Sequence, residues 1–321
     1  LTTSGLSKNF GKLAAVSDLN LEIKQGDVFG FLGPNGSGKT TTIRMLLGLL
    51  RPSAGSVRIF GLDKATHLPD ILPRIGGIIE APVYYSYLSG LENLRVFAMA
   101  SGMRSSEKTR QRIDEVLELV DLTAQARQAC SKYSLGMKQR LAIGMALLSD
   151  PEMILLDEPT NGLDPMGVHE IRQMILRLAA TGKTVVLSSH LLYEVQQVCN
   201  RVAILQKGYL IKQGEVQQLL QQGARLLVRM DTQAEAQAVL LCLRTAHGLD
   251  WITSVEAQDT QIEIGAPPAR ASEVVALLGS QHLYPAEIRP LQSSLEDFFI
   301  DLVAAETPSS GMAALAGKNN A

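Results

Sequence analysis

The sequence predicts an α/β protein with a mostly parallel sheet, an inserted helical subdomain and a second, smaller α+β domain. Over residues 1–221, short apolar runs rich in β-branched residues alternate with helical patterns, which is typical of a mostly parallel sheet. Over about residues 89–150 the alternation gives way to consecutive helical patterns, and at residue 222 a new strand–helix succession begins. These observations divide the chain into two domains and an insertion.

In the first domain, helices and strands are predicted from capping residues and from the spacing of apolar residues. A helix is expected over 38–50, closed by Pro52, and another helix is expected to begin at Asp164-Pro165, with Asp as the N-cap and Pro at the first helical position. Buried strands are expected at 27–32, 153–157, 184–189 and 201–205. In the insertion, a helix is indicated by the i, i+3, i+4, i+7 spacing of Ile113, Val116, Leu117 and Val120.

The second domain is expected over residues 222–305. Its strands are predicted at 225–230, 251–257, 260–265 and 283–289, with helices at 233–246 and 269–280. This succession is the ferredoxin-like order. The region has no evident catalytic cluster, so a regulatory or dimer-supporting role is expected. Residues 306–321 are small and polar, which favours a disordered tail.

Composition narrows the function classes. Apolar residues make up 46% of the 321 residues and charged residues 19%, which favours a large packed core. A net charge of −2 argues against a chain-wide basic surface for nucleic acid, although it leaves a local patch open. The three cysteines are far apart, so neither a disulfide framework nor a zinc site is indicated, and a reducing cytosol is favoured.

No stretch approaches the roughly 20 consecutive apolar residues of a membrane span. If the protein serves a membrane, the spanning part is expected to be another polypeptide. Because the chain starts at Leu1 rather than Met, a few residues are expected to precede it.

Residues 33–40, "GPNGSGKT", predict a phosphate-binding loop. They match G-x-x-x-x-G-K-[ST] between a predicted strand and a predicted helix, which is the context that the motif requires. Glycines allow backbone N–H groups to surround phosphate oxygens, and the helix N-terminus adds partial positive charge. Lys39 is expected to bridge the β- and γ-phosphates and Thr40 to ligate Mg²⁺. The candidate nucleotide-binding residues of this loop are Asn35, Gly36, Ser37, Gly38, Lys39, Thr40 and Thr41.

Two carboxylates follow the predicted strand "MILL". Asp157 stands at the strand end, where a carboxylate can hold Mg²⁺ together with the Thr of the loop. Glu158 comes next and is expected to polarise the water that attacks the γ-phosphate. The alternative, two charges that simply end a strand, is disfavoured because "DEPTNGLDP" continues with more polar groups.

Several segments together resemble the ATP-binding-cassette (ABC) ATPases. These are "GPNGSGKTTT" (33–42), "YSLGMKQRLAIGMALL" (133–148), "LLDEPTNGLD" (155–164) and "VLSSHLLYEV" (186–195). Their order and spacing resemble the family pattern over about residues 4–220. The resemblance implies a P-loop NTPase, RecA-like core that binds ATP and Mg²⁺ and hydrolyses ATP.

The resemblance also implies a shared site. ABC ATPases act as head-to-tail dimers, here a homodimer or a dimer with a related ATPase, in which each nucleotide lies between two subunits. Ser134, Gly136 and Asp164 match positions that reach the nucleotide from across the interface. His190 matches the histidine that senses the γ-phosphate, so Glu158 and His190 are the candidate catalytic residues.

Two further positions are implied to contact the nucleotide. Phe10 matches the aromatic residue that stacks on adenine, and Val16 is placed in the nucleotide-binding set with it. For Phe10 the alternative interpretation is a buried apolar anchor.

The sequence departs from the general family pattern at three positions. The signature has Leu135 and Met137 where the wider family has Gly and Gln, and Glu80 stands where a Gln is usual. A carboxylate is a stronger ligand for a hard cation than an amide oxygen, so Glu80 is a third candidate metal ligand, and Glu80→Gln is expected to raise the Mg²⁺ requirement. The departures resemble a branch of bacterial drug and peptide exporters that includes bacitracin- and lantibiotic-resistance ATPases.

In that branch the membrane domains are separate chains. The resemblance therefore implies transmembrane permease partners, a groove near residues 81–94 that receives them, and a place at the cytoplasmic face of the membrane. Tyr84, Tyr85 and Tyr87 in this region suit an interface or, equally, local packing. A soluble ABC ATPase that acts on ribosomes or DNA is the alternative function, although no nucleic-acid partner is expected. A metabolic kinase is disfavoured by the signature segment.

Overall fold

The computed structural model describes residues 1–80, 83–222, 225–245, 250–291, 294–296 and 298–299. The chain divides into two compact units between Glu215 and Val216. Helix α8 (Val216–Gln222) therefore belongs to the second unit, whereas the sequence placed the boundary between residues 221 and 222, near the end of this helix. The tail expected to be disordered, residues 306–321, lies outside the described residues.

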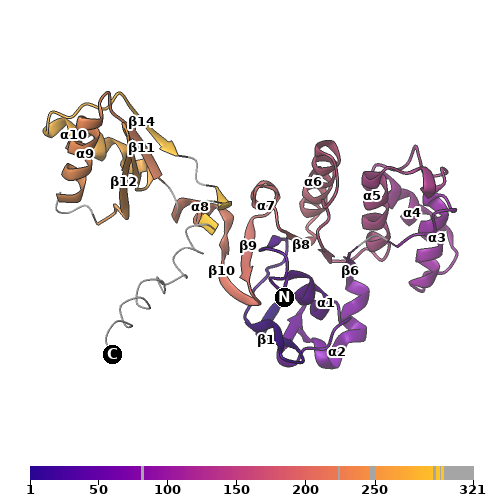
Figure 1. Ribbon diagram of the computed structural model, residues 1–321. Coiled ribbons are helices and arrows are strands. Elements are labelled where there is room, and N and C mark those ends of the chain that lie inside the picture. The colour runs from indigo at the N-terminus through magenta and orange to yellow at the C-terminus, as the bar shows by residue number, and fades with distance from the viewer. Residues whose placement is uncertain (81–82, 223–224, 246–249, 292–293, 297, 300–321) are drawn as a thin grey trace, which may run out of the picture. The chain divides into compact units, whose positions relative to one another are not determined.

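The first unit is built on a six-stranded sheet of order β10-β9-β3-β8-β7-β6 (Figure 1). Its strands are β3 (Val28–Leu32), β6 (Ile75–Ile78), β7 (Met153–Leu156), β8 (Thr184–Ser189), β9 (Arg201–Gln206) and β10 (Tyr209–Glu215). Every pairing is parallel except β9 with β10. All residues of β3, β7 and β8 are buried, as the continuous apolar runs of these segments require. The predicted mostly parallel sheet is confirmed.

A second sheet of this unit was not predicted. It is antiparallel, has the order β2-β1-β4-β5, and consists of β1 (Thr2–Phe10), β2 (Leu13–Leu19), β4 (Ala54–Ile59) and β5 (Leu62–Asp63). Register shifts interrupt both pairings of β1, so its polar and apolar residues do not alternate cleanly along the sequence. Leu6 and Val16 from this sheet share one core with Phe29 and Phe31 of β3. The shared core places β2 beside the loop that follows β3.

Three helices connect or follow strands of the parallel sheet: α1 (Lys39–Leu46) after β3, α6 (Pro165–Ala180) between β7 and β8, and α7 (Leu192–Val198) between β8 and β9. Helix α1 is shorter than the predicted 38–50, and it ends before Pro52 because Gly48 adopts a left-handed φ of 79°. Helix α6 begins as predicted, with Pro165 at the first helical position and Asp164 as its N-cap. Helix α2 (Lys64–Ile71) follows β5.

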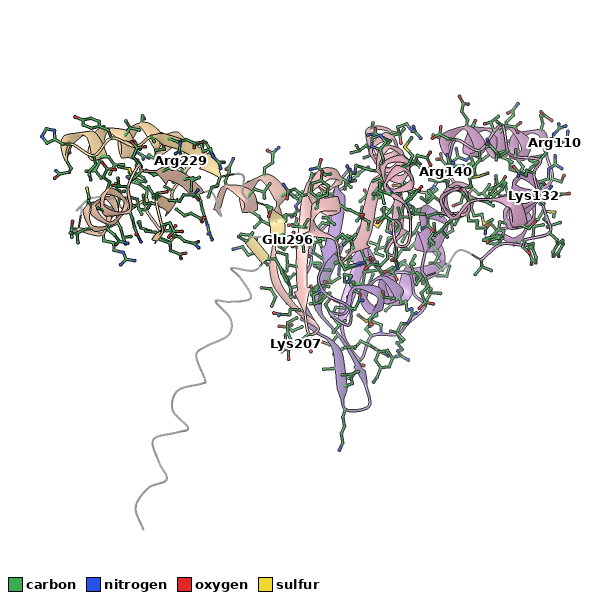
Figure 2. The ribbon with its side chains drawn as sticks, turned by 45° about the horizontal axis from the view of Figure 1, so that its top comes forward. Arg110, Lys132, Arg140, Lys207, Arg229 and Glu296 are labelled. Carbon is green, nitrogen blue, oxygen red and sulfur yellow. The ribbon has the colours of Figure 1, made fainter. Side chains whose placement is uncertain are left out.

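The inserted region contains α3 (Gly90–Ala100), α4 (Glu107–Leu119) and α5 (Leu135–Leu147). The predicted apolar face of α4 is confirmed, since Ile113, Val116, Leu117 and Val120 are all buried. Arg110 and Lys132 mark this subdomain in Figure 2. Within the described ranges, no helix of the protein combines the length and apolar character needed to cross a lipid bilayer.

The second unit contains an antiparallel sheet of order β12-β13-β11-β14 and two longer helices. Its elements are β11 (Arg225–Arg229), α9 (Gln233–Thr245), β12 (Ser254–Gln258), β13 (Gln261–Gly265), α10 (Ala271–Ser280) and β14 (Glu287–Leu291). Residues of the sheet, such as Leu226 and Val228, pack in one core with Val239 and Val274 of the helices. The last strand lies later than the predicted 283–289, because it is defined by pairing Glu287 opposite Arg229 on β11.

Candidate functional site

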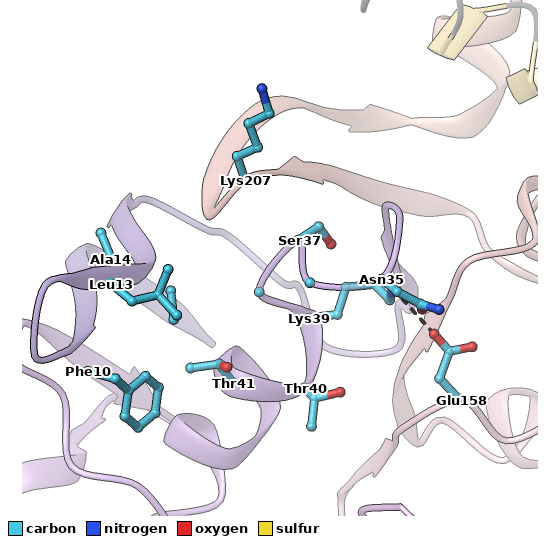
Figure 3. A pocket seen from close by; sticks show the side chains of 13 residues that line it. Phe10, Leu13, Ala14, Asn35, Ser37, Lys39, Thr40, Thr41, Glu158 and Lys207 are labelled. Carbon is cyan, nitrogen blue, oxygen red and sulfur yellow. Dashed lines mark ion pairs between the residues drawn. The ribbon is translucent and has the colours of Figure 1, made fainter.

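A cavity of about 530 Å³ lies where the carboxyl ends of the parallel strands meet β1 and β2 (Figure 3). Its walls come from the β1–β2 hairpin, the phosphate loop, Glu158 in the segment that follows β7, and the turn between β9 and β10. The lining residues are Phe10, Leu13, Ala14, Ala15, Asn35, Gly36, Ser37, Gly38, Lys39, Thr40, Thr41, Glu158 and Lys207. All seven loop residues predicted from the sequence therefore line one cavity.

The loop takes a path that only glycine allows. Gly38 has a φ of 104°, and a Cβ there would lie 2.8 Å from the carbonyl oxygen of Ala15. Gly33 has a φ of 149°, and a Cβ there would lie 2.2 Å from the carbonyl oxygen of Leu205. These glycines let the backbone bend tightly between β2 and β9, directly before the N-terminus of α1. A phosphate group at this point would face backbone N–H groups and the positive end of the helix.

Lys39 is the cation of the loop. Its side chain is only 5% exposed, and Nζ donates a 2.7 Å hydrogen bond to the carbonyl oxygen of Gly33. Nζ also lies 3.3 Å from Oε1 of Glu158 (Figure 3). A buried ammonium held at the cavity wall offers a fixed positive charge to a phosphate chain.

Thr40 and Asp157 come together as a pair of oxygen ligands. The Thr40 hydroxyl donates to Oδ1 of Asp157 at 3.1 Å, although 117 residues separate the two in sequence. Among the described residues, no group of three or more His, Cys, Asp or Glu side chains is arranged to hold a metal ion by itself. A hydroxyl and one carboxylate suit Mg²⁺, which commonly takes one or two protein oxygens and completes its shell with phosphate and water.

Glu158 contacts His190 at the rim of the cavity. Nδ1 of His190 lies 2.9 Å from Oε2 of Glu158, and because a carboxylate only accepts, Nδ1 carries the hydrogen. Glu158 has a left-handed φ of 48°, which is unusual for a residue with a Cβ and has to be held by its surroundings. The predicted catalytic pair is thus in direct contact, with Lys39 on the other carboxylate oxygen.

The apolar end of the cavity differs from the sequence prediction in detail. Phe10 lines it and is 49% exposed, so it is not the buried anchor of the alternative interpretation. Val16 is 1% exposed and belongs to the core behind the loop. The wall is instead formed by Leu13, Ala14 and Ala15, which precede Val16 on β2. Sequence reasoning missed these apolar residues and Lys207, because residues of these types occur throughout the chain and nothing marks them as part of a site.

Comparison with known proteins decides the family. The chain is 38% identical over 308 residues to the bacitracin transport ATP-binding protein BcrA of Bacillus licheniformis, covering 96% of this chain and 98% of that protein. The chain belongs to the ABC transporter ATP-binding family. The ABC transporter family model matches residues 16–161. This chain is an ATP-binding subunit of an ABC transporter, and its enzymatic activity is hydrolysis of ATP.

Two further relatives support the assignment. BcrA of Enterococcus faecalis is 34% identical over 304 residues, covering 94% of this chain and 96% of that protein. Among solved structures, the dimeric post-hydrolysis state of the ATP-binding cassette MJ0796 bound to ADP and Pi superposes with a TM-score of 0.60 at 28% identity. The match covers 67% of this chain and 98% of that cassette.

The three positions of this ABC ATPase that were predicted to reach a nucleotide from across the interface lie outside its own cavity lining. Ser134 is exposed, caps α5 and accepts a 3.2 Å hydrogen bond from the amide of Met137. Asp164 is also exposed, caps α6 and accepts from the amide of Gly167 at 2.9 Å. Gly136 lies in the first turn of α5. Ser134 and Asp164, two of the three residues predicted to reach the nucleotide of a partner subunit, are thus exposed at helix N-termini.

Tyr133 anchors this signature segment. Its ring is buried, and its hydroxyl donates a 2.8 Å hydrogen bond to the carbonyl oxygen of Gln125. Burial raises the pKa of the Tyr133 hydroxyl, so the group stays a neutral donor at physiological pH. Gly90 passes so close that a Cβ there would lie 2.4 Å from this hydroxyl oxygen. The start of α5 is therefore held against α3.

The structure does not bring Glu80 to Thr40 and Asp157. Glu80 has a left-handed φ of 61°, and its carboxylate forms an ion pair with the Arg44 guanidinium of α1. The Glu80 side chain is 66% exposed and is not among the cavity-lining residues. This arrangement does not support direct ligation of a metal by Glu80.

Glu80→Gln is accordingly expected to leave the Mg²⁺ concentration for half-maximal ATPase rate unchanged, in contrast to the sequence prediction. The exposed ion pair with Arg44 is worth at most about 1 kcal/mol of stability, so folding is expected to survive its loss. Mg²⁺ titrations of the ATPase rate on wild type and Glu80→Gln measure the effect. Arg44→Gln is the matched control, because it breaks the same pair and keeps the carboxylate. A raised Mg²⁺ requirement confined to Glu80→Gln would restore the ligand role.

The segment after Glu80 presents aromatic side chains. Ala81 and Pro82 lie outside the described residues, whereas Asn93 of α3 binds both the amide and the carbonyl of Tyr85. The rings of Tyr85 and Tyr87 meet edge to face with centroids 6.0 Å apart, and Tyr87 is 73% exposed. Tyr87 therefore packs locally on Tyr85 and still leaves most of its side chain open to solvent, where another chain could contact it.

Proposed function

We propose that this ABC ATPase powers an exporter of drugs, peptides or lipid-linked compounds through membrane-spanning subunits that are separate chains. The observation that carries the proposal is the similarity to bacitracin transport ATP-binding proteins, which extends over 96% of this chain and therefore includes the second unit. In this proposal the ATPase works at the cytoplasmic face of the membrane. Binding and hydrolysis of ATP close and open a dimer whose motion the membrane subunits follow.

The proposed chemistry follows from the contacts in the cavity. Lys39 and the loop amides bind the β- and γ-phosphates, and Phe10 stacks on the base. Thr40 and Asp157 hold Mg²⁺, which when bound offsets negative charge on the phosphates. Glu158 accepts a proton from the attacking water, and His190, which donates to the other side of that carboxylate, holds it in place.

The nucleotide site is proposed to be completed by a second subunit. Ser134, Gly136 and Asp164 stand at or beside the N-termini of α5 and α6, where backbone N–H groups attract anions. In a head-to-tail dimer these termini would meet the γ-phosphate held by the partner. The proposed partner is a second copy of this chain or a related ATPase.

The second unit is proposed to be a ferredoxin-like module that regulates or supports the dimer. Its element succession, strand-helix-strand-strand-helix-strand, and its antiparallel order β12-β13-β11-β14 support that class. The face of the sheet away from the helices carries ion pairs, among them Arg229 with Glu287 and Arg225 with Glu263 (Figure 2 labels Arg229). None of the predicted site residues lies in this unit.

The proposed permease contact centres on Tyr87. A photoreactive amino acid placed at this position in cells is expected to cross-link the ATPase to an integral membrane chain, identified by mass spectrometry of purified membranes. The same substitution at Tyr209, which is 55% exposed on β10 of the same unit, is the matched control and is expected to give no such product. Cross-links from position 87 to ribosomal proteins alone would favour the soluble alternative and contradict the proposal.

A further inference from the structure

Ser188 touches both carboxylate residues of the hydrolytic site. Its hydroxyl donates a 2.6 Å hydrogen bond to Oδ1 of Asp157, and its oxygen accepts a 2.9 Å hydrogen bond from the backbone amide of Glu158. The side chain is fully buried, and Asp157 is 4% exposed. Ser188 does not line the cavity itself.

The sheet explains why these groups meet. Strands β7 and β8 are parallel neighbours, with Leu156 opposite Leu187. Asp157 directly follows Leu156 at the end of β7, and Ser188 follows Leu187 on β8, so the two residues lie side by side at the carboxyl ends of these strands. Glu158 follows Asp157 in the turn after β7, and His190 directly follows the last residue of β8, two residues after Ser188.

A serine hydroxyl has the hydrogen-bonding capacity that this position requires. Its single proton goes to Asp157, and a lone pair receives the Glu158 amide. Oδ1 of Asp157 thus accepts from two hydroxyls, those of Ser188 and Thr40. The bond to the amide helps to hold Glu158 in its left-handed conformation, with φ at 48°.

We propose that Ser188 is a positioning residue that sets the Asp157 carboxylate for the metal and the Glu158 backbone for the attacking water. Because Ser188 does not line the cavity, it is proposed to act through these two residues. The inference rests on the ATP–Mg²⁺ site proposed above. One buried oxygen of Ser188 thus links the side chain of Asp157 to the backbone of Glu158.

The test measures Mg²⁺-dependent nucleotide binding, separately from turnover. In a Glu158→Gln background, binding of a fluorescent methylanthraniloyl-ATP is titrated with Mg²⁺ and compared with binding in EDTA. Adding Ser188→Ala is expected to raise the Mg²⁺ midpoint roughly tenfold, the effect of losing one hydrogen bond to a charged group, and to leave binding in EDTA unchanged. With Glu158 intact, Ser188→Ala is expected to lower kcat more than it changes KM for ATP.

Thr184→Val is the matched control for the loss of a buried hydroxyl. Thr184 is the first residue of β8, so it lies at the opposite end of this strand from the site. Its side chain is 2% exposed and accepts a 3.0 Å hydrogen bond from the amide of Gly26. It is expected to lower thermal stability and keep the Mg²⁺ midpoint. An equal shift of the midpoint in Thr184→Val and Ser188→Ala would overturn the proposal.

Ser188→Thr and Ser188→Val cover the case in which Ser188→Ala does not fold. These two variants have nearly the same shape and differ in the hydroxyl, so Ser188→Thr is expected to need less Mg²⁺ than Ser188→Val. Equal midpoints for the two would reject the positioning role. If the Glu158→Gln parent bound nucleotide without any dependence on Mg²⁺, both the proposed metal site and the inference about Ser188 would be rejected. If binding by the parent depended on Mg²⁺ and Ser188→Ala left the Mg²⁺ midpoint unchanged, only the inference about Ser188 would be rejected.

Discussion

Lys39→Ala is expected to abolish ATP turnover and to weaken ATP binding severely. The Lys39 ammonium is the cation buried in the wall of the cavity, and it already lies 2.7 Å from the Gly33 carbonyl oxygen within the phosphate loop. Hydrogen bonds to charged groups are worth about 1.5–3 kcal/mol each, so each lost phosphate contact costs roughly ten- to a hundredfold in affinity. The variant also removes the positive charge beside Oε1 of Glu158, which keeps its hydrogen bond from His190, and so leaves more negative charge where the phosphates bind.

Isothermal titration with ATP and a phosphate-release assay measure the effect of Lys39→Ala. Lys183→Ala is a suitable control, because Lys183 directly precedes the amino end of β8, which is the end away from the cavity, and forms an ion pair with Asp150. This control is expected to bind and hydrolyse ATP at the wild-type level. Near-normal turnover in Lys39→Ala would contradict the assignment of the whole nucleotide site.

Glu158→Gln is expected to bind ATP and to hydrolyse it about 10²–10⁴-fold more slowly, the usual contribution of a positioned general base. The amide oxygen of Gln can still accept the hydrogen bond that Nδ1 of His190 donates at 2.9 Å, so the side chain is expected to keep its place. What is lost is the capacity to take a proton from water. Trapped ATP is expected to hold two subunits together through Ser134, Gly136 and Asp164.

Single-turnover hydrolysis and light scattering test the two parts of this prediction for Glu158→Gln. Glu152→Gln is the matched control, since Glu152 lies just before the other end of strand β7 and pairs with Arg74. An unchanged rate in Glu158→Gln would show that another group activates the water. A slow variant that stays monomeric with ATP would instead count against the proposed trans contacts.

The phosphate loop and the buried strands could be predicted because their signals are local. A glycine-rich loop, a continuous apolar run and an N-cap such as Asp164 express their physics within a few neighbouring residues. The antiparallel sheet was missed because shifts of register in β1 break the alternation that reveals a strand. The end of α1 was placed too late because Gly48 ends the helix before Pro52 does.

By itself, the sequence determined which chemical groups this ABC ATPase has: a lysine and a threonine on a phosphate loop, two carboxylates after a buried strand, and a histidine after another. Only the tertiary structure decided which of them touch. The pairing of β7 with β8 places Ser188 against Asp157 and His190 against Glu158. Glu80 instead forms an ion pair with Arg44 of α1 and does not line the cavity. The physical reason is that strand register and helix packing are set by burial of residues far apart in the chain, so contacts between polar groups at the sheet edge depend on the whole core.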